Sequence, residues 1–328
     1  MDQKVYIHVG LFKTATTYLQ KQVFPNIDGI DYFTIHKPFQ EYIWTINQKA
    51  PFQPSSFDPT NLNTFSQKIL ISREDLLGSP FHNYINAHHT LTELKQNFPE
   101  SKILLTIRKQ DDLIESLYRQ HIQAGGVQSV RKFINYDRYS NSYKPYTFKH
   151  GINLDIHSLN YLDIYNYLSH VFGQENVTLI PYELIKDDKE LFLEKLATFL
   201  DEDSLNISIS AKSSSNRSIS KLSISLARVL NRLFKIKSNS GFGLIPQTPF
   251  REYLLRHYKK NKVLGLLLLL SSKITVRNIL QNGLDKFIYV KGDCLKEKYR
   301  NGIMNQHAAS NQKLDDLLGL HLKKYKYY

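Results

Sequence analysis

A short segment near the start of the chain, HVGLFKTATTYLQ, combines residue types that bind phosphate groups. Gly10 allows a turn after an apolar strand, Lys13 adds a positive charge, and Thr14, Thr16 and Thr17 add hydroxyl donors. A strand-to-helix turn directs backbone N–H groups and the positive end of the helix dipole at one point, so the segment predicts an anion site. Its spacing is not that of a GxxxxGK[ST] loop. The alternative interpretation is a capped helix start with an exposed lysine.

A second group of residues, within KILLTIRKQDDLIESLYRQHI, has similar chemistry. Arg108 follows an apolar strand, and its guanidinium can bind a phosphate through two parallel hydrogen bonds. Ser116 lies eight residues later on the expected helix and would add a hydroxyl donor. The alternatives are an ion pair of Arg108 with Asp111 or Asp112 and an incidental helical serine. Together with the Lys13 segment, the pair favours two phosphate sites.

These residues follow elements of an α/β fold. Apolar runs without alternation, typical of strands buried on both faces, occur at Val5–Val9, Ile69–Ser72, Lys102–Ile107 and Val177–Pro181. Helical patterns occur between or after them, at Thr14–Phe24, Asp112–Gln123 and Leu191–Leu200. Strands that alternate with helices predict a mostly parallel sheet with helices on both faces.

The chain has two parts of very different charge. Residues 1–200 hold 20 Lys and Arg against 21 Asp and Glu, a net of −1, whereas residues 201–328 hold 23 against 9, a net of +14. We expect one domain, with residues 1–200 as the core and residues 201–328 as a basic, mainly helical portion packed on it. The excess charge favours an anionic ligand or surface, although a merely soluble basic face is the alternative. The run Val263–Leu270 is too short to span a membrane, and we interpret it as a buried helix or as a surface that touches lipid.

The Lys13 segment resembles the 5′-phosphosulfate-binding loop of sulfotransferases that use 3′-phosphoadenosine 5′-phosphosulfate (PAPS). That loop reads approximately K-[ST]-G-T-T, a bulky residue and Leu, and this chain has Lys13 to Leu19, KTATTYL. Ala15 replaces the glycine, a change that requires a negative φ at that residue. The segment with Arg108 and Ser116 is similar to the family's 3′-phosphate site. VTLIPYELIKD resembles its late strand, where Tyr182 takes the place of a tyrosine beside the nucleotide.

The resemblance implies a sulfotransferase with the P-loop-nucleotide-kinase-like fold, a three-layer sandwich around a mostly parallel sheet. Lys13, Thr14, Ala15, Thr16, Thr17, Tyr18, Arg108, Ser116, Tyr182 and Arg217 are its expected PAPS-binding residues. Lys13 would also stabilise charge on the leaving 3′,5′-bisphosphate (PAP). Arg217 is included only because family members have a basic loop, late in the chain, that folds over the nucleotide.

The resemblance implies a general base, His or Glu, just after the strand that precedes the Arg108 strand. Glu74 is our choice there, within ILISREDLL, although Ser72 to Asp75 also has the spacing of a helix capping box. His82 and His121 are the alternatives, because a near-neutral histidine is a competent base. No metal is expected: the adjacent pair His88 and His89 has no convincing ligand spacing.

We expect the acceptor to be a carbohydrate hydroxyl, on a polysaccharide or glycolipid, with the basic portion near an anionic acceptor or membrane and no nucleic acid as partner. The one cysteine, Cys294, excludes an internal disulfide, and MDQKVYIHVG has no signal-peptide pattern, so a cytoplasmic protein is expected. The resemblance alone implies a bacterial protein. One rival hypothesis is a nucleoside or sugar kinase, which should show a Walker A loop. The other is a polyanion-binding module without catalysis, which would leave the two phosphate sites unexplained.

Overall fold

The computed structural model describes residues 3–34, 65–145, 153–205, 207, 219–235, 245–246 and 280–328. The chain divides into two compact units. The first contains Met1–Leu113, Ser142–Ser214 and Asn301–Tyr328, and the second contains Ile114–Asn141 and Ser215–Arg300. Two of the boundaries fall within the helices α4 (Gln110–Gln123) and α14 (Glu297–Leu318), and the other two follow Asn141 and Ser214.

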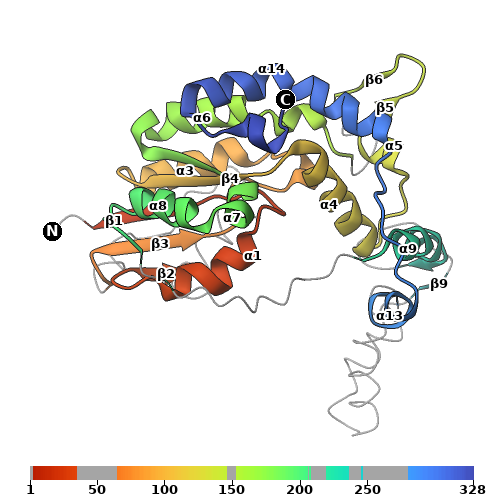
Figure 1. Cartoon of the computed structure of the whole chain (residues 1–328), viewed down its shortest axis with the longest axis horizontal. Helices are drawn as coiled ribbons and strands as arrows, with labels where there is room; N and C mark the ends of the chain where they lie inside the picture. Colours follow the sequence, from red (N-terminus) through yellow and green to blue (C-terminus); the bar gives the residue numbers. More distant parts are fainter. Residues whose placement is uncertain are drawn as a thin grey trace, which may run out of the picture. The chain divides into compact units, whose positions relative to one another are not determined.

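The first unit contains a five-stranded sheet in which every neighbouring pair of strands is parallel (Figure 1). The strands in spatial order are β2 (Asp31–Phe33), β3 (Lys68–Ser72), β1 (Lys4–His8), β4 (Lys102–Ile107) and β7 (Val177–Pro181). The chain builds β2 and β3 on one side of β1 and then β4 and β7 on the other. Sheets of this kind bind ligands at the C-terminal ends of the strands, beside the point where the order reverses. The topology therefore directs attention to the ends of β1, β3 and β4.

Helices cover both faces of this sheet (Figure 1). On one face lie α8 (Lys189–Phe199) and a helical run after β1, which contains α1 (Thr16–Tyr18), a π-helical turn (Leu19–Val23) and a 3-10 turn (Phe24–Asn26). They enclose a core with strand residues Tyr6, Leu70, Leu104 and Ile180. The helices α3 (Ala87–Asn97) and α6 (Tyr161–Phe172) pack on each other, and α6 also contacts β4 and β7. The expected three-layer α/β arrangement is confirmed.

The strands form because their apolar residues are buried on both faces. In β4, every residue after Lys102 is buried. The predictions for β4 and β7 match the observed bounds, and β1 begins and ends one residue earlier than expected. The edge strand β2 was not predicted, because it has three residues, of which Phe33 alone is buried.

The C-terminal segment of the chain belongs to the first unit. Its last side chains pack inside that unit: Tyr327 is fully buried, and its hydroxyl donates to Glu183 Oε2 at 2.8 Å. Asn311 of α14 donates to the Tyr327 carbonyl at 2.9 Å and to Gln110 Oε1 at 3.0 Å. The other elements of this unit are α7 (Tyr182–Asp187), β6 (Ser142–Tyr143) and the 3-10 turns Pro80–His82, Ile156–Leu159, Gln174–Asn176 and Leu322–Tyr325.

The second unit is organised around two buried carboxylates. Glu115 accepts hydrogen bonds from Arg119 Nε at 2.6 Å and from the backbone N–H groups of Cys294 and Leu295. Asp285 accepts from the Ser220 N–H at 2.9 Å and from the Ser223 hydroxyl. The unit's elements include α5 (Val130–Phe133), β5 (Tyr136–Asp137), α9 (Lys221–Leu233), β8 (Phe234–Lys235), β9 (Ile245–Pro246), a π-helical turn (Leu280–Leu284) and α13 (Asp285–Phe287).

Two sequence predictions lie outside the described residues, namely Arg217 and the apolar run Val263–Leu270. Within the described ranges, no helix has both the length and the apolar character needed to cross a membrane.

Candidate functional site

The turn between β1 and α1 contains two residues in the left-handed region. Lys13 and Ala15 both have φ of 67°, and Ala15, with ψ of 13°, is the N-cap of α1. An alanine at position 15 was expected to have a negative φ, and that expectation is wrong. An L-residue in this region is strained by roughly 1–2 kcal/mol, so Ala15 occupies a position that suits glycine. Successive residues of alternating handedness turn their N–H groups toward one side, which is the geometry of an anion-binding nest.

A series of buried hydrogen bonds, in which each hydroxyl donates to the next acceptor, fixes the turn. The Thr14 hydroxyl donates to the Leu11 carbonyl at 2.6 Å and lies 2.7 Å from Thr106 Oγ1. Because the one Thr14 hydroxyl proton is already used, Thr106 must donate to Thr14. The Thr106 oxygen then accepts from His8 Nε2, at 3.2 Å. The Thr14 side chain is fully buried, so its hydroxyl holds the turn and does not point outward to a ligand as predicted.

The same chain continues to the end of β3. With Nε2 protonated, His8 Nδ1 accepts from the Ser72 hydroxyl at 2.8 Å, and Ser72 Oγ accepts from Gln20 Nε2 at 3.2 Å. Burial lowers the pKa of His8 to about 3, so its imidazole is neutral at physiological pH. These six residues, which we call the strand-end network, are Leu11, Thr14, Thr106, His8, Ser72 and Gln20. The network links the ends of β1, β3 and β4 to the turn.

Gly10 lies against this network. A Cβ atom at Gly10 would lie 2.4 Å from His8 Nε2 and 2.7 Å from Thr106 Oγ1, which is closer than atoms can approach. The requirement for glycine is therefore close packing on His8 and Thr106 and not an unusual φ.

The remaining residues of the loop differ in exposure. Lys13 and Thr17 are exposed, Thr16 is buried with its hydroxyl 3.4 Å from the Leu11 carbonyl, and Ala15 and Tyr18 pack against the core. Of the three threonines, Thr17 alone has an exposed side chain. The first N–H groups of a helix have no intrahelical acceptor, so the loop's backbone retains its capacity to bind an anion.

Arg108 meets the loop directly. Its Nη1 donates to the Lys13 carbonyl oxygen at 3.1 Å, although the two residues are 95 positions apart. The backbone carbonyl of Arg108 in turn accepts from the hydroxyl of the fully buried Tyr161. The two sequence segments expected to bind phosphate therefore converge at the ends of β1 and β4.

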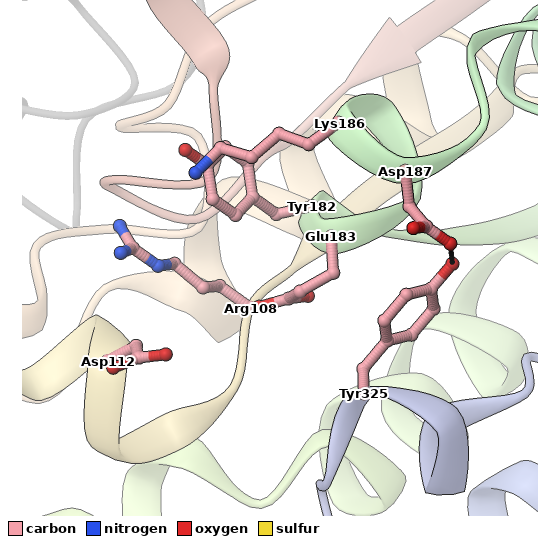
Figure 2. A pocket seen from close by; sticks show the side chains of 7 residues that line it. All are labelled: Arg108, Asp112, Tyr182, Glu183, Lys186, Asp187 and Tyr325. Carbon is pink, nitrogen blue, oxygen red and sulfur yellow. Dashed lines mark hydrogen bonds between the residues drawn. The ribbon is translucent and has the colours of Figure 1, made fainter.

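Tyr182 lies beside Arg108. The guanidinium carbon of Arg108 is 4.8 Å from the centre of the Tyr182 ring, at the distance of a cation–π contact. Tyr182 begins α7 directly after β7 and packs against the core of the first unit. Both residues line a pocket of about 320 Å³, which we call the Arg108 pocket (Figure 2). Its lining residues are Arg108, Asp112, Tyr182, Glu183, Lys186, Asp187 and Tyr325.

Asp111 and Asp112 follow Arg108 and were its alternative ion-pair partners. Lys109 Nζ lies 3.4 Å from Asp111 and 3.6 Å from Asp112. The Arg108 contacts that define the site are those with the Lys13 carbonyl and the Tyr182 ring.

Glu74 lies in a turn after β3, and the helix required for a capping box does not form there. Arg73 forms a two-pronged ion pair with Asp75, whereas Glu74 stays half-buried. Burial raises the pKa of Glu74, and the positive charge of Lys13 acts in the opposite direction. Glu74 is therefore near Lys13, and its raised pKa makes its carboxylate a stronger proton acceptor than an exposed glutamate.

Three other predicted residues have different surroundings. His82 is exposed at the end of the 3-10 turn Pro80–His82. His121 is buried in the second unit with its ring stacked on Phe133 at 5.1 Å, and burial lowers its pKa to about 4. Ser116 is half-buried on α4 in the second unit and stays a prediction.

The described part of the chain contains no group of three or more His, Cys, Asp or Glu side chains that could hold a metal ion. His88, a member of the His88–His89 pair, lies on α3 with its ring 5.8 Å from that of Tyr167.

Sequence reasoning missed His8, Thr106 and Lys186. The first two are polar residues within otherwise apolar strands, and a buried strand tolerates such residues only when they are hydrogen-bonded. That signal could have identified them. Lys186 gave no signal, because an exposed lysine on a short helix is common.

No family model and no curated protein matches the chain. Among solved structures, one similar chain is a sulfotransferase from Alicyclobacillus acidocaldarius, with 15% identity, a TM-score of 0.43, and coverage of 65% of this chain and 88% of that one. Another is mouse sulfotransferase SULT7A1 complexed with PAP, with 14% identity, a TM-score of 0.35, and coverage of 62% of this chain and 60% of that one.

Proposed function

We propose that this protein is a sulfotransferase that uses PAPS. The observation that supports this most strongly is the hydrogen bond from Arg108 to the Lys13 carbonyl, because it joins the two sequence segments that resemble the 5′- and 3′-phosphate sites of that family. A ligand with phosphates at both ends of an adenosine requires two such groups of donors within one nucleotide's length. Tyr182, against the Arg108 guanidinium, adds an aromatic surface of the kind on which a base stacks.

The proposed reaction moves a sulfuryl group from the phosphate oxygen of PAPS to an acceptor hydroxyl. The new S–O bond forms to the acceptor oxygen, the bond to the phosphate oxygen breaks, and PAP leaves. Lys13 and the loop N–H groups stabilise the charge that develops on the phosphate oxygen. Glu74 accepts the hydroxyl proton, and the nearby Lys13 charge helps to keep its carboxylate ionised despite burial.

We also propose Ser116 and Arg217 as nucleotide-binding residues, on the basis of sequence resemblance alone. The proposed acceptor is a carbohydrate hydroxyl, on a polysaccharide or glycolipid. Its support is the net charge of +14 on residues 201–328, which suits an anionic glycan or contact with an anionic membrane surface. Incubation of cell extracts with labelled PAPS, followed by mass spectrometry of the sulfated products, would identify the acceptor. If the label appears in protein and not in glycan, the proposed class of acceptor is wrong.

The donor assignment is tested by thermal unfolding in the presence of nucleotides. PAP at a hundredfold excess over Kd should stabilise the protein by about 2.7 kcal/mol, and ATP with Mg²⁺ should stabilise it much less. Stabilisation by ATP with Mg²⁺ alone would favour a kinase. Stabilisation by neither nucleotide, together with binding of a sulfated glycan, would favour the polyanion-binding module.

Substitutions in the two segments provide a second test. Lys13→Ala and Arg108→Ala should each weaken PAP binding by ~1.5–3 kcal/mol, since each removes a charged donor. Lys21→Ala is the matched control, because Lys21 is an exposed lysine on the same helical run. Unchanged affinity in both site variants would refute the assignment of the site.

A further inference from the structure

The Arg108 pocket contains a second cation that no sequence motif identified. Lys186 lies on α7, one helical turn after Tyr182, and its Nζ is 4.5 Å from the centre of the Tyr182 ring. Arg108 approaches the same ring at 4.8 Å. In Figure 2 the charged ends of Arg108 and Lys186 both lie beside the Tyr182 ring, away from Asp187 and Tyr325. One aromatic ring therefore gathers two positive charges.

The carboxylates of the pocket are bound to groups other than Lys186. Glu183 accepts from the Lys109 backbone N–H at 3.2 Å and from the Tyr327 hydroxyl at 2.8 Å. Lys109 Nζ is 3.6 Å from Asp112. Among the described residues, no carboxylate lies within ion-pair distance of the Lys186 ammonium.

Asp187 follows Lys186 on α7, and the C-terminal segment binds its carboxylate. Lys324 forms an ion pair with Asp187 Oδ2, and the Tyr325 hydroxyl lies 3.5 Å from the same atom (Figure 2). This contact lowers the pKa of Asp187, with the Lys324 hydrogen bond as the main cause. The C-terminal segment thus neutralises the one acidic side chain that is adjacent in sequence to Lys186.

Like charges held together repel each other, and an anion between them removes that repulsion. We propose that Lys186 is a second phosphate-binding residue of the Arg108 pocket, and that Lys324 keeps it available by holding Asp187. This inference rests on the proposed use of PAPS and assigns Lys186 to the 3′-phosphate, the group that Arg108 binds. It makes the C-terminal segment part of the nucleotide site through its charge.

Isothermal titration with two nucleotides tests the role of Lys186. Lys186→Met should weaken binding of PAP by about tenfold, as expected for loss of one charge-assisted contact at an exposed site. It should change the affinity for adenosine 5′-monophosphate, which has no 3′-phosphate, by less than about twofold. Lys189→Met is the matched control, because Lys189 is an exposed lysine at the start of the next helix, α8. This variant should bind both nucleotides as the unaltered protein does.

The outcomes separate this inference from the proposed function. If the unaltered protein binds PAP and Lys186→Met binds it equally well, the inference is wrong and the proposed function stands. Equal losses for both nucleotides would also overturn the assignment to the 3′-phosphate. If the unaltered protein binds no PAP, both proposals are wrong.

A double-mutant cycle tests the role of the C-terminal segment. Lys324→Met should release Asp187 toward Lys186 and weaken PAP binding by about two- to threefold, the size expected for one exposed ion pair. Addition of Asp187→Asn should restore the affinity, because the competing carboxylate is then absent. Lys323→Met, one residue earlier in the same 3-10 turn, is the control. No loss in Lys324→Met, or a loss that Asp187→Asn does not restore, would overturn the role assigned to Lys324.

Discussion

The loop after β1 and the Arg108 pocket serve the same proposed ligand but are built in opposite ways. The loop presents backbone N–H groups, and the strand-end network holds it through buried hydrogen bonds among Thr14, Thr106 and His8. The pocket presents long cationic side chains, Arg108 and Lys186, which rest on one aromatic ring near solvent.

The two constructions make different properties of the protein sensitive to substitution. A backbone site costs little reorganisation on binding, but its geometry depends on every buried partner beneath it. When a charge is removed from a side-chain site, the fold is unchanged and only the affinity for the ligand falls. We therefore expect changes at the strand ends to alter stability or turnover, and changes in the pocket to alter nucleotide affinity.

The largest expected effect concerns Glu74, on the loop side. Glu74→Gln should lower turnover by ~10²–10⁴ while PAP affinity stays the same, because the amide cannot accept the proton. In the unaltered protein, turnover should fall as the pH drops through the raised pKa of Glu74. Release of PAP from PAPS in acceptor-containing extract measures both effects. Turnover that survives the substitution would mean that another residue is the base.

The next effect separates the two regions by stability. Thr106→Val should reduce the free energy of unfolding by ~1–3 kcal/mol, since it leaves His8 Nε2 with no acceptor and removes the donor to Thr14. Thr106→Ser should restore most of the loss. Urea unfolding measures both variants, with Thr198→Val, an exposed threonine on α8, as control. If Arg108→Ala destabilises the protein as much as Thr106→Val, the contrast between the regions is false.

The pH dependence of stability sharpens the same contrast. The pKa of His8 is about 3 in the folded protein and 6.5 for an ordinary histidine, so the unfolded chain binds one more proton between those pH values. Stability should therefore fall as the pH is lowered from 6.5 toward 3, and His8→Gln should remove up to about 1.4 kcal/mol per pH unit of that slope. Urea titrations at several pH values test this. An unchanged slope would mean that His8 is not buried and neutral.

The smallest effect has the opposite sign. Ala15→Gly should stabilise the protein by ~0.5–1 kcal/mol. Glycine removes the strain of an alanine in the left-handed region, and this gain exceeds the cost of the greater conformational entropy of glycine in the unfolded chain. The same substitution at Ala197, inside α8, should destabilise by about 1 kcal/mol. Thermal or urea unfolding of the two variants checks the difference in sign. Destabilisation at both positions would contradict the φ assigned to Ala15.

Much of the fold was predictable because it depends on local pattern. β4 and β7 were predicted at their observed bounds, since continuous apolar runs indicate strands buried on both faces. β2 was not predictable, because a three-residue edge strand has almost no pattern. Lys13 and Arg108 could be chosen as anion-binding residues because a strand end followed by a helix is itself a local signal.

The sequence alone determined which residue types follow each strand, and hence the kind of chemistry at the sheet's C-terminal edge. The tertiary structure decided what those residues touch. It brought Arg108 to the Lys13 carbonyl across 95 positions, placed Lys186 on the Tyr182 ring, and put Ala15 in a left-handed conformation. The physical reason is that burial and strand order set these contacts, and both depend on the whole first unit and not on any one segment of it.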